Sequence, residues 1–268
     1  MKLFDFFGKT LYRIMRPCFS LGGTLSSSLI LGFIGGYPVG AATIMAAYDK
    51  KYCSKKEAER ALAFCNNCGP AFILATVGNA FFNSPKTGIL LLTVHIFSAI
   101  LTGIIFKFLF PIQEKSNQSF FEKSNNLPSF SSAITNSVSA SLKSIFSVSA
   151  YIVFFSVFLC VLHKAGILAF ITSLVSDTFG FNHQTTNAFI IGVFEMTSGI
   201  FSLSSGSESL ITLALVAFLL GWGGFSVHFQ TQSIFSESDI DLREYYIGKF
   251  FHGILSFLFA LFISGLVF

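Results

Sequence analysis

The chain has 268 residues, of which 53% are hydrophobic and 11% are charged, and its mean hydropathy is +0.71. A soluble domain carries roughly 25% charged residues, so this composition excludes an ordinary soluble domain and predicts an all-α polytopic membrane protein in a lipid bilayer. The net charge is +4. Because no basic cluster is interleaved with aromatic residues, nucleic acid is not an expected partner.

Two apolar stretches in the first half of the chain contain residues that break a helix. The motif GGYPVGA (35–41) lies in the first stretch and CNNCGP (65–70) in the second. Each contains a proline, which removes a backbone donor. Irregular backbone at membrane depth is tolerated only where protein buries it or water fills a cavity beside it, so each motif is a candidate wall of a solute site. In order, we expect an amphipathic surface helix at 1–17 and a first repeat at 18–110, with a re-entrant hairpin at 18–47, a broken helix at 61–82 and a spanning helix at 87–110.

The second half of the chain repeats this order. Three pairs of landmarks are each separated by 157 residues, namely His95 and His252, Gly35 and Gly192, and Asn66 and Gly223. The constant separation predicts an internal repeat. In order, we expect a polar linker at 111–133, a connecting transmembrane helix at 134–163 and a second repeat at 166–268, with a surface helix at 167–179, a hairpin at 186–204, a broken helix at 209–235 and a spanning helix at 246–268.

The basic residues predict the orientation of the two repeats. If the first interrupted stretch crossed the membrane fully, the basic N-terminus and the charged loop 49–60 would face opposite sides, against the positive-inside rule. A re-entrant hairpin puts both on the cytoplasmic side together with Lys249, leaves only Lys86 and Lys164 outside, and makes Cys53 accessible from the cytoplasm. The N-terminus is then cytoplasmic, and the repeats are inverted as in many secondary transporters.

Polar residues at the interruptions are the candidate site residues. Glu195 is an acid inside an apolar run, and intramembrane carboxylates are functional by default. The amides of Asn66 and Asn67 can donate and accept hydrogen bonds, and His228 can relay a proton near neutral pH. Each also has a structural alternative, such as a hydrogen bond between helices or a buried ion pair. The predicted substrate-binding residues are Tyr37, Pro38, Asn66, Asn67, Glu195, Thr197, Ser198, Ser226, His228 and Gln230.

Four motifs carry a family resemblance, FIGGYPVGA, ERALAFCNNCGPAFI, GVFEMTSGI and GGFSVHFQ. In this order they resemble the nucleoside recognition (Gate) domain membrane proteins, most closely the sporulation integral membrane proteins of the YlbJ type, over nearly the whole chain from Arg16 onward. The resemblance implies an architecture similar to that of concentrative nucleoside transporters, with two re-entrant hairpins and two broken helices around the substrate. It also implies a dipicolinate-like or nucleoside-like solute, a role in sporulation, and a bacterial inner (plasma) membrane or forespore membrane. Typical members carry further N-terminal spanning helices, and they have Ser, Thr or Asn where this chain has Cys65 and Cys68.

Three functional hypotheses follow. The first is a transporter or facilitator for a small polar aromatic solute, with no cofactor and with Na⁺ or H⁺ as the coupling ion. The second is a non-transporting scaffold or subunit that needs a membrane partner, or a homo-oligomer. The third is a divalent-metal permease gate, because Cys65 and Cys68 have C-x-x-C spacing, although only Glu195 and His228 are available as further ligands. An enzyme is not expected, because the sequence has no nucleophile–base set, P-loop or zincin motif.

Overall fold

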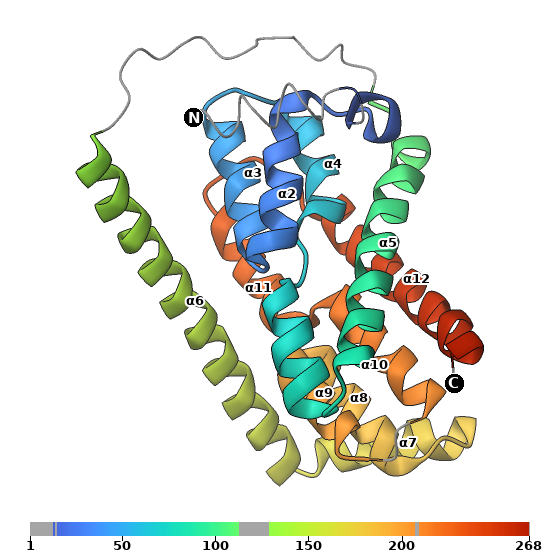
Figure 1. Cartoon of the computed structure of the whole chain (residues 1–268). Helices are drawn as coiled ribbons and strands as arrows, with labels where there is room; N and C mark the ends of the chain where they lie inside the picture. Colours follow the sequence, from blue (N-terminus) through green and yellow to red (C-terminus); the bar gives the residue numbers. More distant parts are fainter. Residues whose placement is uncertain (1–12, 14, 113–128, 207–208, 268) are drawn as a thin grey trace.

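Every regular element is a helix in the part of the chain that the computed structural model describes, residues 13, 15–112, 129–206 and 209–267 (Figure 1). The predicted all-α polytopic membrane fold, in contact with lipid, is confirmed. Most of the surface helix predicted for 1–17 lies outside the described residues. Within the described ranges, the helices long and apolar enough to cross a membrane are Pro85–Leu109, Phe130–Lys164, Leu210–Phe235 and Arg243–Ile263.

The first half begins with a helical hairpin. After the short 3-10 turn η1 (Gly23–Leu25), helix α2 (Ser26–Gly35) pairs with helix α3 (Val39–Asp49). The chain turns at Gly36, whose φ of +76° lies in the region that glycine adopts without steric penalty. The tip of the hairpin therefore lies inside the sequence motif that interrupts the first apolar stretch.

An interrupted helix and a long straight helix follow the hairpin. Helix α4 (Lys55–Cys65) ends at the irregular stretch 66–69, and the π-helical segment η2 (Phe72–Phe81) comes after it. Helix α5 (Pro85–Leu109) has a proline at its first position, where the missing N–H has no intrahelical partner to lose. The hydroxyl of Ser84 caps α5 by accepting a hydrogen bond from the amide of Thr87 at 3.2 Å.

Helix α4 begins inside the stretch 49–60 that the sequence analysis assigned to a charged loop. Its first turn is closed by a capping box, in which the Ser54 hydroxyl accepts from the Glu57 amide at 3.3 Å and the Glu57 carboxylate accepts from the Ser54 amide at 3.0 Å. The same carboxylate accepts from the amide of Gly22 at 2.8 Å. Glu57 of this turn is thus buried with partners, and residues 55–60 are helical rather than a loop.

The second half contains a second hairpin, a second interrupted helix and the last long helix. The elements are α8 (His183–Phe194), α9 (Met196–Ser204), α10 (Leu210–Trp222), α11 (Gly224–Phe235) and α12 (Arg243–Val267). In Figure 1, α2, α3 and α4 gather at one end of the molecule, whereas α8 and α9 gather at the other end together with α7 (Ile167–Phe179).

Several corresponding helix ends in the two halves are separated by the same number of residues. The first residues of α2 and α8, the first residues of α3 and α9, and the last residues of α4 and α10 are each 157 positions apart. Helices α5 and α12 both have 25 residues. We call two residues that are 157 positions apart counterparts.

Helix α6 (Phe130–Lys164) connects the halves and runs along one side of the molecule (Figure 1). It begins four residues before the predicted start at 134, because the hydroxyl of Ser129 caps it by accepting from the amide of Ser132 at 3.2 Å. Phe155 and Leu159 are its buried residues, whereas Val153, Phe154 and most of its other large apolar side chains are exposed. An apolar helix with such an exposed surface suits contact with lipid.

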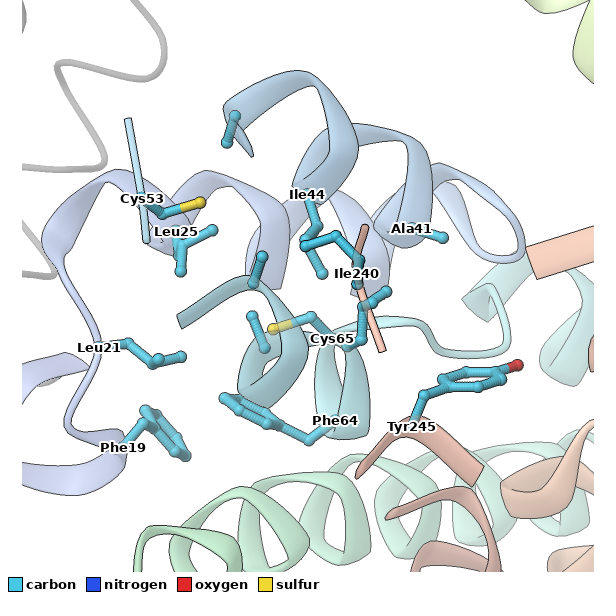
Figure 2. Close-up of a cluster of buried hydrophobic side chains, with 14 of the residues drawn as sticks. Phe19, Leu21, Leu25, Ala41, Ile44, Cys53, Phe64, Cys65, Ile240 and Tyr245 are labelled. Carbon is cyan, nitrogen blue, oxygen red and sulfur yellow. The ribbon is translucent and has the colours of Figure 1, made fainter. Parts of the chain in front are cut away.

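Buried apolar side chains form two clusters, which we call the first-half and second-half clusters after the half that supplies most of their residues. The first-half cluster includes Phe19, Leu21 and Leu25, which lie over α4, and the Phe19 ring stacks on the Phe64 ring with centroids 4.7 Å apart (Figure 2). Cys53 is buried in this cluster, so the expectation that it is accessible to labelling is wrong. The second-half cluster joins η2 and α5 to α8, α9 and α10.

Candidate functional site

Both hairpins turn where an interrupted helix breaks, and glycines bring the two backbones into contact. A Cβ atom at Gly36 would lie 2.9 Å from the amide nitrogen of Gly69. A Cβ atom at Gly224, whose φ is +78°, would lie 3.1 Å from the amide nitrogen of Met196. A larger residue would push each hairpin tip away from its break. These contacts place four irregular backbone segments inside the molecule.

Two side chains connect the second break to the hairpin tips. The hydroxyl of Tyr37, at the first tip, donates to the carbonyl oxygen of Leu220 in α10 at 3.2 Å. The indole of Trp222 donates to the carbonyl oxygen of Val193 in the second hairpin at 3.3 Å. Of the predicted site residues, Tyr37 therefore lies between the two halves, and Pro38 precedes the first residue of α3.

A fully buried lysine lies beside Tyr37. The Nζ atom of Lys249 in α12 donates to the carbonyl oxygen of Asn66 at 3.0 Å, lies 3.2 Å from Nδ1 of His252, and is 5.1 Å from the centre of the Tyr37 ring. It makes no salt bridge with an acidic residue of the described chain. The prediction that Lys249 faces the cytoplasm is wrong, because these contacts enclose it within the helices.

Sequence reasoning missed Lys249 as a site residue. The signal was present, because a lysine inside the apolar helix of 246–268 is subject to the same argument as Glu195. The sequence analysis instead counted Lys249 among the cytoplasmic loop charges, and so did not treat it as an intramembrane residue. A basic residue within the first two turns of a spanning helix can lie in a loop-side or an interior position, and only the packing of α12 on α4 and α5 distinguishes the two.

Two histidines extend the polar contacts of Lys249. His252 Nε2 lies 3.0 Å from the carbonyl oxygen of His95, to which it donates, and His95 Nε2 accepts from the amide of Cys68 at 3.1 Å. The two rings lie 4.5 Å apart between centroids. His95 and His252 are counterparts, so equivalent positions of the two halves meet beside the buried lysine.

A second series of hydrogen bonds runs from Asn66 toward α11. The amide of Asn66 donates to the hydroxyl of Thr231 at 2.9 Å and accepts from the amide of Ala41 at 3.3 Å. The hydroxyl of Tyr245 donates to Thr231 at 3.1 Å and lies 3.0 Å from Nδ1 of His228. Figure 2 shows the Tyr245 hydroxyl directed away from the labelled apolar side chains. The structure thus joins the predicted residues Asn66 and His228 in one buried network.

Several buried polar atoms around this network have no hydrogen-bond partner in the described chain. Buried polar groups are nearly always paired, so unpaired ones invite a ligand or an ordered water. All of them belong to residues of the first break, α5 or α11. These atoms are Oδ1 of Asn67, Nδ1 of His95, Nε2 of His228 and Oε1 of Gln230.

The predicted residue Glu195 has another arrangement. Its carboxylate accepts from the amide of Thr197 at 3.0 Å and from the amide of Ser198 at 2.7 Å, which caps α9. A carboxylate at a helix N-terminus is stabilised by the unpaired N–H groups and the helix dipole. Its side chain therefore positions the second hairpin tip. The side chains of Thr197 and Ser198 are half-buried, and Ser226 is buried in α11.

The two cysteines of the first break lie in different apolar clusters. Cys65 belongs to the first-half cluster and Cys68 to the second-half cluster. Within the described ranges, no three His, Cys, Asp or Glu residues are grouped so as to hold a metal ion. The structure gives both thiols the surroundings of small apolar packing residues.

A cavity of about 670 Å³ lies between the second hairpin and α10. Its wall is mainly apolar, but the hydroxyls of Thr186, Ser209 and Thr212 also line it. Phe189 borders the cavity and contacts Phe218, with ring centroids 5.5 Å apart. Phe218 in turn packs on Gly253, one turn beyond Lys249 on α12, because a Cβ there would lie 3.0 Å from its ring. The remaining lining residues are Val175, Phe181, Asn182, Gln184, Thr185, Ala188, Ile190, Ser202, Leu203, Gly206, Ile211, Leu215 and Phe257.

Apolar spanning helices around a buried polar network define an integral membrane protein with a polar interior. Among known proteins, the chain is similar to the sporulation integral membrane protein YlbJ of Bacillus subtilis (strain 168). The two are 28% identical over 279 residues, which cover 96% of this chain and 68% of that protein. No protein-family model matches the chain, and no solved structure matches it.

Proposed function

We propose that this protein is a membrane transporter or facilitator for a small polar aromatic solute that carries an anionic group. The observation that carries the proposal is Lys249, a fully buried basic residue without an acidic partner in the described chain, at the point where the first hairpin tip meets a helix break. Intramembrane ionisable residues face a pathway or a partner, because an isolated charge there is unfavourable. A solute carboxylate is the missing partner.

The surroundings of Lys249 suit an aromatic carboxylate better than a neutral nucleoside. The Tyr37 ring offers a flat apolar surface, and the unpaired atoms of Asn67 and His228 offer hydrogen-bonding groups. Dipicolinate-like solutes combine a planar ring with carboxylates, whereas a nucleoside provides no charge to pair with the lysine. The similarity to a sporulation protein agrees with a dipicolinate-like solute in a spore-forming cell.

The repeated helix bounds support inverted repeats as the basis of transport. Equal separations relate both hairpins and both interrupted helices, and the hairpins lie at opposite ends of the molecule (Figure 1). In secondary transporters with inverted repeats, the solute site lies at the midplane between the repeats and alternates between the two sides. We place the first hairpin and the N-terminus on the cytoplasmic side. The mechanism requires no chemical conversion of the solute and no cofactor.

The exposed surface of α6 favours a second candidate, a subunit within a larger membrane assembly. Phe130, Ile134, Val138 and Phe146 are all exposed along its first half. Another membrane protein or a second copy of this chain would cover that face. Recovery of the purified protein as a single chain that still binds a solute would count against this candidate.

Thermal stabilisation tests the transporter proposal directly. A ligand that binds only the folded state raises the melting temperature by mass action. We expect dipicolinate to raise it more than any member of a nucleoside panel, Fe²⁺ or Zn²⁺. The shift should disappear in Lys249→Gln and persist in Lys55→Gln, a control that removes an exposed lysine paired with Asp239. Equal shifts in both variants, or no shift with any solute, would contradict the proposed site.

A further inference from the structure

We propose that Lys249 takes up one proton each time an anionic solute binds, so that the solute is carried with H⁺ rather than Na⁺. The inference rests on the proposed function and adds the coupling ion and the residue that carries it. In the empty site Lys249 is a neutral amine. In the loaded site it is an ammonium group paired with the solute carboxylate.

The contacts of Lys249 match the needs of a neutral amine. Such an amine has two N–H donors, and Nζ has two acceptors, the carbonyl oxygen of Asn66 at 3.0 Å and Nδ1 of His252 at 3.2 Å. His252 accepts at Nδ1 because its Nε2 donates to the carbonyl oxygen of His95 at 3.0 Å. This tautomer follows from the hydrogen-bond network. Both donors of a neutral amine are thus satisfied within the protein.

An ammonium group at this position lacks a countercharge. Its third N–H would face the ring of Tyr37, 5.1 Å away, and a cation–π contact is weak beside the penalty for burying an unpaired charge. The nearest acid on α12, Glu244, is already paired with Arg60 at 3.2 Å. Glu195 is engaged by two backbone amides of α9.

The titratable groups that face Lys249 are a phenol, imidazoles and a thiol. No carboxylate is among them in the described chain, so none can compensate a positive charge at neutral pH. They come from the hairpin tip, the first break, α5, α11 and α12. The groups are Tyr37, Cys68, His95, His228 and His252.

An arriving carboxylate supplies the negative charge that a protonated Lys249 lacks. One proton moves from water to Nζ, one ion pair forms, and no bond within the solute changes. When the solute leaves, the ammonium group loses the proton to water, and the resulting amine keeps its two hydrogen bonds. The positive charge of the proton cancels the negative charge of the carboxylate that Lys249 pairs with. This cancellation lowers the penalty for bringing an anion to membrane depth.

Calorimetry of solute binding tests the proton directly. Dipicolinate is titrated into the full chain in lipid nanodiscs at one pH, in buffers of different ionisation enthalpy, and the slope gives the number of protons taken up. We expect about one proton for each bound dipicolinate, and a dissociation constant that rises about tenfold per pH unit where the free amine is neutral. Lys249→Arg, which stays charged, should bind with no proton uptake. Lys55→Gln should behave as the unmodified chain.

The possible results separate this inference from the proposed function. Binding without proton uptake in the unmodified chain overturns the inference and leaves the transporter proposal standing. Binding with proton uptake that persists in Lys249→Gln assigns the proton to a group other than Lys249 and also overturns it. No binding at all contradicts the proposed function itself. Should Lys249→Arg fail to fold, the slope for the unmodified chain still decides whether a proton is taken up, and Lys249→Gln, which should no longer bind, decides whether Lys249 is required.

Discussion

The helices of the two hairpins begin at counterpart residues but pack on their interrupted helices in different ways. In the first half, Gly32 and Gly40 lie so close to the carbonyl oxygen of Cys65 that a Cβ atom on either would overlap it. Their counterparts in the second half are Phe189 and Thr197, and a cavity lies between part of the second hairpin and α10. The first hairpin therefore packs closely on the end of α4, whereas the second hairpin touches its break at the tip but leaves space beside α10.

The same contrast holds at the outer ends of the hairpins. Leu29, Tyr52 and Ile100 pack against the first-half cluster that includes Phe19 and Leu21. The counterparts of those three residues are Thr186, Ser209 and Phe257, and all three line the cavity. The segment before the first hairpin thus fills a space that remains open in the second half. For the proposed transporter, this asymmetry makes the structure closed beside the first hairpin and accessible beside the second.

The largest expected difference between the halves is the side of the membrane that each hairpin faces. Cysteines at Lys50 and Ser205, exposed positions after the first and second hairpins, should react with an impermeant maleimide from opposite sides of the membrane. We expect Lys50→Cys to react from the cytoplasmic side and Ser205→Cys from the outside. Labelling of both from one side would disprove the inverted arrangement.

The labelling needs a suitable background. The exposed Cys160 and the half-buried Cys18 should be replaced by serine. The native Cys53 cannot serve as the reporter, because burial raises the pKa of its thiol to about 12 and the thiolate is the reactive form. A background variant that still reacts strongly would contradict this account of Cys53.

The packing of the two outer ends predicts unequal responses to truncation. Phe19→Ala removes a ring stacked on Phe64 in a filled cluster and should lower the free energy of unfolding by about 3–5 kcal/mol. Phe257→Ala removes a ring that already borders a cavity and should lower it by less than about 2 kcal/mol. Denaturant titration in detergent would measure both changes in the free energy of unfolding. Equal losses would show that the second half is as tightly packed as the first.

The sequence predicted the membrane class and the places where the backbone becomes irregular, because glycine, proline and polar residues stand out within apolar stretches. The helical start of α4 was missed because the charges of 55–60 suggested a loop, while the hydrogen-bond partners of the buried Glu57 and Glu59 come from distant segments. Lys249 was missed because its charge was counted at the helix end. The cap formed by Glu195 and the cavity depend on geometry that no pattern of residues displays.

Exchanging the residues of one pair of counterparts tests the difference in packing between the two halves, and its expected effect is the smallest. Thr186→Leu gives the second half the residue that its counterpart, Leu29, provides in the first, and should fill part of the cavity. We expect the free energy of unfolding to rise by about 0.5–2 kcal/mol, as for other cavity-filling changes. Solute uptake into proteoliposomes should fall, because this space is where the proposed transporter is accessible beside the second hairpin. Leu29→Thr should destabilise the protein without creating a second entrance, since Phe19 and Leu21 still cover that end. If Thr186→Leu raised stability but left uptake unchanged, the cavity would be a packing defect rather than a route for the solute.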